Sequence, residues 1–264
     1  MTDRLAAAEA LLADLVGFAS ISGQPNGEIV NYIKTYLESH GVIAHLDSHE
    51  DGQRFNLFAS IGPQIDGGIL LSGHLDVVPA NPAGWSRDPF VLHKQDGRLY
   101  GRGTADMKGF LAIALAMAPA FQEAASQLAK PVHIAFTFDE EVGSFGAAQM
   151  PSMMDRLGVK PAIAVVGEPT GMKPFIGHKG GLELIADIRG TAGHASDPRG
   201  TVNTLYYAAR LISYLEDKAR SLANHPRHDT PFDPPYTTIS VGHVKGCLLY
   251  TSDAADEGLG VDLG

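Results

Sequence analysis

The chain has 264 residues, of which 44% are hydrophobic and 19% charged, values typical of a globular protein with one large domain or two smaller ones. Its formal net charge of −10 argues against nucleic acid as a partner, because a nucleic-acid binder needs a basic surface that displaces counterions. Neither a cationic secretory start nor an apolar stretch long enough to cross a bilayer is present, so we expect a cytoplasmic protein that does not use a membrane.

Two amphipathic helices are predicted at the start of the chain. Leucine and valine side chains recur on one helical face over residues 4–16, and isoleucine, tyrosine and leucine recur at the same spacing over 28–38. Residues 55–61 then alternate in character, which predicts an exposed strand.

Three continuous apolar runs follow, over residues 69–73, 132–138 and 162–167. Runs of this length are typical of strands that are buried on both faces of a sheet covered by helices. Helical patterns over 107–118 and 146–157 lie between them, and strands that alternate with helices indicate a parallel sheet. We therefore expect an α/β fold with a mostly parallel central sheet flanked by helices.

The last third of the chain has a different pattern. Alternation over 182–188 predicts a half-exposed strand, amphipathic spacing over 203–218 predicts a helix, and 237–244 is typical of a further strand. The expected organisation is a larger domain over residues 1–177 and a smaller α+β domain over 178–246.

Each of the three apolar runs is followed by side chains that can bind a metal ion. In chain order these are His74 and Asp76, then Asp139, Glu140 and Glu141, then Glu168. Ligands of parallel sheets bind beyond the carboxyl ends of the strands, so we expect these side chains to meet at one edge of the sheet.

The spacing of His74 and Asp76 places both side chains on the same side of an extended backbone. Asp76 could then orient the imidazole through its second nitrogen, as carboxylates do beside metal-bound histidines. Taken alone, the pair is explained more simply as a core histidine beside an acid.

A glycine-rich loop over residues 101–109 presents Asp106 at the start of a helix. The loop lacks the Lys-Ser/Thr ending of a phosphate-binding loop, and Asp106 would repel an anion. A flexible turn with a capping aspartate explains the loop about as well as presentation of Asp106 to a metal does.

The adjacent acids Asp139, Glu140 and Glu141 raise one another's pKa unless a cation neutralises them. A solvated acidic turn is one explanation, and a metal ligand beside a general base is the other. Glu168 alone would be an ordinary loop residue. Together, one histidine and several carboxylates at one edge suit two Zn²⁺, Co²⁺ or Mn²⁺ ions that share a carboxylate and activate a water.

Five motifs make the chain resemble a known family. SGHLDVVPA, LYGRGTADMKGF, TFDEEVGSFGA, VGEPTGMKPFIGHKGG and GTAGHASDPRGTVN follow one another in the order found in the dinuclear zinc deacylase and carboxypeptidase family. The resemblance covers residues 10–246. It implies a zinc-peptidase-like catalytic domain over 1–177 that lacks its C-terminal return segment, and an inserted lid or dimerisation domain over 178–246 that is incomplete.

The resemblance also implies a set of metal ligands. His74 and Glu168 would bind the first ion and Glu141 the second. Asp106 would bridge both ions, next to a strained peptide bond to Met107. Two divalent ions, Zn²⁺ or Co²⁺, are therefore the expected cofactors.

Catalytic roles follow from the same resemblance. Asp76 would orient His74, and Glu140 would be the general base. His194, in the smaller domain, would reach the active site of a partner subunit and steady the oxyanion, which implies a homodimer.

The activity implied is hydrolysis of the amide bond of N-acetyl-L-ornithine to ornithine and acetate by a metal-activated water, a step of arginine biosynthesis. Alternatives within the family are a desuccinylase acting on succinyl-diaminopimelate, another N-acyl amino acid hydrolase or a metallocarboxypeptidase. A non-catalytic metal-binding scaffold is the alternative of another class, and it would be expected to lack Glu140 or Asp106.

The resemblance stops after Gly246. The family carries a further metal-binding histidine near its C-terminus, which is missing here, and residues 247–264 resemble a translated sequencing adapter. We therefore predict that 247–264, with the only cysteine, Cys247, is a non-native tail. The 264-residue polypeptide is expected to lack one ligand of the second metal and to have low activity and stability.

Overall fold

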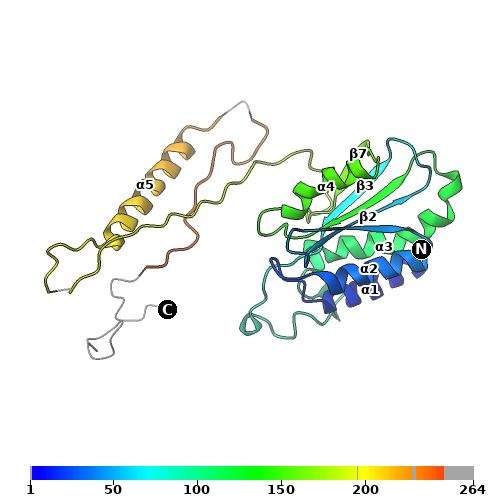
Figure 1. The fold of residues 1–264 in the computed structure, drawn as a ribbon, viewed down its shortest axis with the longest axis horizontal. Helices are drawn as coiled ribbons and strands as arrows, with labels where there is room; N and C mark the ends of the chain where they lie inside the picture. The colour runs from blue at the N-terminus through cyan, green and yellow to red at the C-terminus, as the bar shows by residue number, and fades with distance from the viewer. Residues whose placement is uncertain (1, 195, 228–229, 247–264) are drawn as a thin grey trace. The chain divides into compact units, whose positions relative to one another are not determined.

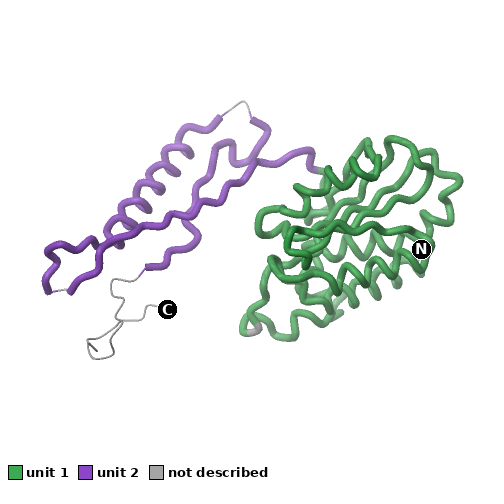
Figure 2. Tube along the Cα trace, viewed as in Figure 1, with its two compact units in different colours: residues 1–174 green, residues 175–264 purple. Residues whose placement is uncertain are grey.

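The computed structural model describes residues 2–194, 196–227 and 230–246. The chain divides into two compact units, residues 1–174 and 175–264 (Figure 2), and each unit is described by itself. The predicted non-native tail, 247–264, lies outside the described residues.

Unit 1 is built on a sheet that, within the described residues, has five strands (Figure 1). In the spatial order β1-β2-β6-β3-β7, the strands are β1 (Ala44–Ser48), β2 (Phe55–Ile61), β6 (Val132–Thr137), β3 (Ile69–His74) and β7 (Ile163–Val166). β3 is parallel to both β6 and β7, whereas β2 is antiparallel to both β1 and β6. Among the described strands of this sheet, β2 alone therefore runs in the opposite direction to the others. The predicted α/β class with a mostly parallel sheet is confirmed.

Helices cover both faces of this sheet (Figure 1). α1 (Thr2–Gly17), α2 (Gly27–Ser39) and α3 (Gly109–Glu123) lie on one face, and α4 (Phe145–Arg156) lies on the other. The main core fills the space between the first three helices and the sheet, and its fully buried side chains include Leu15, Val16, Ile33, Leu111, Leu115 and Phe136. A smaller cluster beneath α4 contains Phe58, Leu70, Ala135, Met150 and Met153.

Several short elements were not predicted from the sequence. A two-stranded hairpin consists of β4 (His93–Gln95) and β5 (Arg98–Tyr100). Single helical turns lie at Pro82–Gly84 and Ala125–Gln127, and a wider turn, Thr104–Lys108, precedes α3.

Two strand predictions need correction in their burial. Residues 55–61 form a strand as predicted, but β2 lies inside the sheet and buries Leu57 and Phe58, because β1 pairs with its outer edge. The run at 162–167 is predicted to be buried, yet Ile163 and Val166 are 61% and 57% exposed. β7 is an edge strand, and the described part of unit 1 leaves these side chains uncovered.

Unit 2 contains the predicted helix, α5 (Thr204–Asn224). Asn203 caps it, since its side chain accepts a hydrogen bond from the N–H of Leu205 at 3.0 Å. The strands predicted over 182–188 and 237–244 are not formed in the described structure. Apolar side chains of the first stretch are exposed, so neither a partner strand nor a core stabilises it.

The expectation that no apolar stretch is long enough to cross a bilayer needs correction: within the described residues one helical stretch, Thr104–Glu123, is long and apolar enough by length and composition alone. Its side chains Leu111, Leu115 and Ala118 are fully buried against the rest of unit 1. The core helix of a globular domain passes the same test, and this burial identifies α3 as such a helix.

Leu115 and Ile113 offer a matched test of this core, because both lie on α3 but Leu115 is buried and Ile113 is 58% exposed. Leu115→Ala should lower the free energy of unfolding by about 2–5 kcal/mol through lost burial and a residual cavity. Ile113→Ala should change it by about 0.5 kcal/mol or less. Urea unfolding followed by circular dichroism measures both, and equal losses would contradict the assigned packing.

Candidate metal site

The carboxyl ends of the parallel strands meet at one edge of the sheet. β3 ends at His74, the turn after β6 carries Glu140 and Glu141, and Glu168 follows β7. The parallel register of β3 with β6 and β7 aligns these strand ends, as expected for the ligand-binding edge of such a sheet. Asp106 joins them from the turn before α3.

His74, Asp106 and Glu168 form a compact cluster of possible metal ligands. One donor atom of each lies within 4.8 Å of the other two. Nε2 of His74 is 3.0 Å from Oδ1 of Asp106 and 3.9 Å from Oε1 of Glu168. The imidazole is buried, whereas the Asp106 and Glu168 side chains are 47% and 38% exposed. The cluster is thus closed behind the histidine and open on the carboxylate side.

The hydrogen bonds of His74 fit a cation between the ring and the carboxylates. Nδ1 lies 2.9 Å from the main-chain carbonyl of Asp76, and Nε2 faces the carboxylate of Asp106. A carbonyl and an ionised carboxylate can only accept, so both ring nitrogens must carry protons when no metal is bound. A divalent ion on Nε2 would replace one proton and leave the Nδ1 hydrogen bond in place, which is the usual setting of a metal-bound histidine.

The electrostatics of the cluster reflect its excess of carboxylates. Burial lowers the pKa of His74, but hydrogen bonds to Asp76 and Asp106 and the charge of Glu168 outweigh burial and raise this pKa to about 9. Burial and the charge of Asp106 raise the pKa of Glu141 and of Glu168. A cation would relieve this repulsion, so one imidazole with several carboxylates is a donor set that fits a divalent metal.

Asp76 connects the histidine to the acidic turn. Its Oδ1 lies 3.5 Å from Nδ1 of His74 and accepts the N–H of Glu140 at 3.0 Å. Its Oδ2 accepts the N–H of Glu141 at 3.3 Å and the hydroxyl of Ser22 at 2.7 Å. Burial raises the pKa of Asp76, but these interactions outweigh burial and lower the pKa below its usual value. An ionised Asp76 therefore holds both halves of the site together.

The turn before α3 positions Asp106 against the end of β3. The peptide bond between Asp106 and Met107 is cis, and Sδ of the buried Met107 accepts the N–H of His74 at 3.3 Å. A side chain at Gly73 would lie 2.7 Å from Leu111 and 2.8 Å from Met107. Glycine at this position thus allows the strand end to approach the turn closely.

Two predicted site residues lie outside the compact cluster. Glu141 is near enough to Asp106 for the charge of Asp106 to raise its pKa, but within the described residues it is not one of the three clustered ligands. His194 belongs to unit 2, where its Nδ1 lies 2.6 Å from Oγ of Ser196. The roles inferred for both residues stay predictions.

Some residues that support the site cannot be recognised from a pattern in the sequence. Ser22 binds Asp76, and the fully buried Lys108 donates from Nζ to the carbonyls of Leu15 and Phe18 at 2.9 and 2.7 Å. Burial lowers the pKa of Lys108 to about 7 against the opposing charge of Asp76. These contacts join the end of α1 to the site across long stretches of sequence, so a local pattern does not reveal them.

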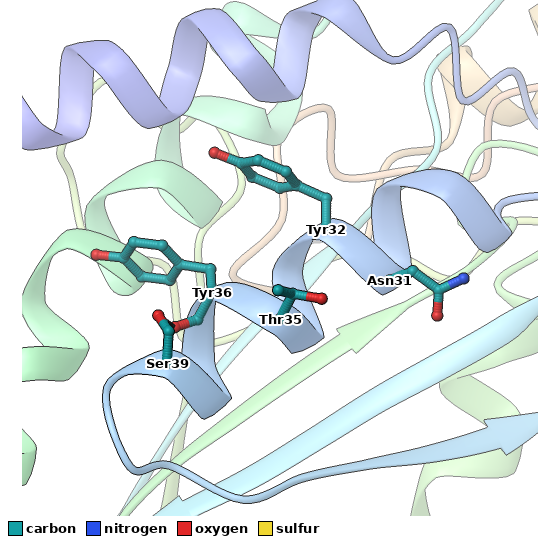
Figure 3. Close-up of a pocket in the computed structure, with 5 residues that line it drawn as sticks. All are labelled: Asn31, Tyr32, Thr35, Tyr36 and Ser39. Atoms are coloured by element: carbon teal, nitrogen blue, oxygen red, sulfur yellow. Dashed lines mark hydrogen bonds between the residues drawn. The ribbon is translucent and has the colours of Figure 1, made fainter.

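A separate depression lies along α2 (Figure 3). Its lining residues are Asn31, Tyr32, Thr35, Tyr36 and Ser39. All five belong to one helix and none is a carboxylate, an imidazole or a thiol, so the depression lacks the groups that make the sheet edge a candidate site.

The sheet edge and its donor set define unit 1 as an α/β protein with a candidate divalent-metal site. Residues 70–247 match peptidase family M20/M25/M40, which is more than half of the chain. The chain belongs to this family.

Relatives in sequence and structure agree with that assignment. The acetylornithine deacetylase of Proteus mirabilis (strain HI4320) is 35% identical over 247 residues, which cover 89% of this chain and 61% of the relative. The chain therefore spans less than two thirds of the length of this curated relative.

Solved structures show the same fold. An M20 family metallo-carboxypeptidase from Sulfolobus solfataricus has 26% identity and a TM-score of 0.53, covering 61% of this chain and 37% of that chain. Human carnosine dipeptidase 1 has 26% identity and a TM-score of 0.51, covering 62% and 39%. A Staphylococcus aureus tripeptidase, at 20% identity and a TM-score of 0.54, covers 80% and 56% and supports the fold alone.

Zinc binding should displace a proton from His74. Because the pKa of His74 is raised to about 9, the metal-free ring is protonated at pH 7, and zinc affinity should rise with pH and level off above that value. Calorimetry in buffers of different ionisation enthalpy should show about one proton released per zinc ion at pH 7 from this ring. His74→Asn should abolish this release, and His45→Asn, on the exposed face of β1, should not. Zinc binding without proton release would contradict the assignment.

Proposed function

We propose that the whole protein is a metal-dependent amidohydrolase that cleaves N-acetyl-L-ornithine to ornithine and acetate, a step of arginine biosynthesis. The observation that carries the reaction type is the convergence of His74, Asp106 and Glu168 beside the turn that holds Glu140. The 35% identity to an acetylornithine deacetylase supports the substrate.

Two divalent ions are the proposed cofactors. In this proposal His74 and Glu168 would hold one ion, Glu141 would hold the other, and Asp106 would be a ligand of both. Imidazole and carboxylate donors without thiolates suit Zn²⁺ and also Co²⁺. When bound, such ions polarise an amide carbonyl and lower the pKa of water.

Glu140 is the proposed general base. Its main-chain N–H is fixed by Asp76 at 3.0 Å, and its Oε1 lies 3.5 Å from the hydroxyl of Ser144. The backbone is thus held while the half-buried carboxylate stays accessible at the edge of the site. Glu140 would take a proton from the attacking water and deliver it to the leaving amine.

His194 is the proposed oxyanion stabiliser, acting in the site of a partner subunit. The N–H of Ser196 donates to Nδ1 of His194 at 3.2 Å, so the neutral ring carries its proton on Nε2. An Nε2–H donor is suited to a developing oxyanion. This role requires a homodimer, which we propose with it.

Residues 1–177 are the proposed catalytic domain, and residues 178–246 are a proposed partial lid or dimerisation domain. β7 exposes Ile163, Val165 and Val166, and the chain spans 61% of the curated relative. Both facts support a further segment that covers this edge in the whole protein. A cytoplasmic location without nucleic-acid or membrane partners completes the proposal.

Other acyl groups and amino acids are the competing substrates within the family. N-succinyl-diaminopimelate, other N-acyl amino acids and dipeptides differ from N-acetyl-L-ornithine in the groups on either side of the amide. A panel of these substrates, assayed with Zn²⁺ or Co²⁺, separates them by the ratio of their kcat/KM values. The panel is best applied to the chain continued to the full length of its gene.

Glu140→Gln tests the proposed mechanism because it keeps the shape of the side chain and removes its basicity. We expect kcat for acetate release to fall about 10²–10⁴-fold while bound metal is retained. Glu50→Gln, an exposed acid on the loop after β1, should leave kcat unchanged and serves as the control. Equal turnover by the Glu140 variant would contradict the role, and metal binding without turnover of any substrate by either form would favour the scaffold alternative.

A further inference from the structure

Asp139, the residue before Glu140, is held by contacts of its own that are separate from those of Asp76. Its side chain is buried, and its backbone has a φ of 54°, in the left-handed region that aspartate tolerates better than most residues. Its Oδ1 accepts the N–H of Gly23 at 2.7 Å, and its Oδ2 forms an ion pair with Nη1 of Arg54. The direction in which the chain enters the acidic turn therefore depends on these two partners.

Arg54 is itself held in place from several sides. Its Nε donates to Asp51 at 2.7 Å, its guanidinium lies 5.6 Å from the centre of the Phe138 ring, and its side chain is only 18% exposed. A guanidinium constrained in this way donates to a carboxylate oxygen in a fixed direction. A lysine ammonium, which is not planar and lies on a flexible stem, fixes that direction less well.

Two neighbouring residues of one loop, Ser22 and Gly23, hold the acidic turn through Asp76 and Asp139 respectively. Ser22 binds Asp76, which accepts the N–H groups of Glu140 and Glu141. Gly23, the next residue, binds Asp139. Arg54 is the cationic member of this arrangement and neutralises Asp139 inside the protein.

We propose that Arg54 is a positioning residue. Through Asp139, it sets the direction in which Glu140 and Glu141 face the cluster of possible metal ligands formed by His74, Asp106 and Glu168. Without the guanidinium, the buried carboxylate of Asp139 would lack a counter-ion and would turn toward water. Because Asp139 immediately precedes Glu140, that movement would release the N–H groups of Glu140 and Glu141 from Asp76. The inference rests on the proposed function for the roles of these two glutamates.

Amide hydrogen exchange of the metal-free chain tests the structural part without metal or substrate. In Arg54→Met, exchange at Glu140 and Glu141 should accelerate by about tenfold or more, while β3 and β6 keep their protection. Arg54→Lys should show a smaller acceleration. Arg156→Met, which removes the surface ion pair to Asp47, should leave both amides unchanged and is the matched control.

A kinetic arm tests the consequence in the full-length enzyme. Arg54→Met should lower kcat by about tenfold or more with little change in KM, because it displaces the base rather than the substrate. Added guanidinium ion should restore part of kcat to an Arg54→Ala variant. If the protein does not hydrolyse the proposed substrates, the kinetic experiment cannot be done, but the hydrogen-exchange experiment still tests the positioning role because it needs neither metal nor substrate.

Three results would overturn the proposal: unchanged exchange at Glu140 and Glu141, acceleration spread evenly over unit 1, or an equal effect of Arg156→Met. If Arg54→Met does not fold, Arg54→Met combined with Asp139→Asn removes both charges and keeps an acceptor for Gly23. Because no uncompensated charge remains, the double variant should fold and keep exchange at the two glutamates close to that of the wild type. A double variant that fails to fold, or one with strongly accelerated exchange at these amides, would equally overturn the proposal.

Discussion

The candidate metal site of unit 1 depends on a buried histidine that is surrounded by more carboxylates than it can neutralise. His74 faces Asp106 and Glu168 through Nε2 and Asp76 through Nδ1, and the oxygens it meets can only accept hydrogen bonds. The pKa of the ring is raised to about 9, so a proton occupies the position that a divalent cation would take. The site is therefore already organised for a positive charge, which is the physical basis for placing a metal there.

The fold supplies this arrangement through the parallel part of its sheet. β3, β6 and β7 end together, and each strand end or following turn brings a histidine or an acid to the same edge. Interactions over long sequence distances then fix the turns: Asp76 holds the backbone of Glu140, and Lys108 ties the Asp106 turn to the end of α1. Packing alone would leave these turns mobile, because polar turns bury little apolar surface.

Sequence patterns predict the parts of this architecture that are local. Helical spacing gives α1, α2 and α5, and apolar runs give β3 and β6, because each pattern reports which face of one element is buried. The exposure of β7 is missed because apolar composition alone cannot show whether another element covers an edge strand. Ser22, Arg54 and Lys108 are missed because their partners are distant in sequence and nothing nearby marks them.

The central claim is that His74, Asp106 and Glu168 bind one divalent ion together. Anomalous X-ray diffraction at the zinc edge, on crystals grown with Zn²⁺, tests it directly. We expect a peak about 2.0–2.2 Å from Nε2 of His74 and from a carboxylate oxygen of each acid. A zinc peak elsewhere on the chain and none at His74 would contradict the claim. So would a structure at saturating zinc in which Asp106 and Glu168 point away from His74 and no ion lies beside it.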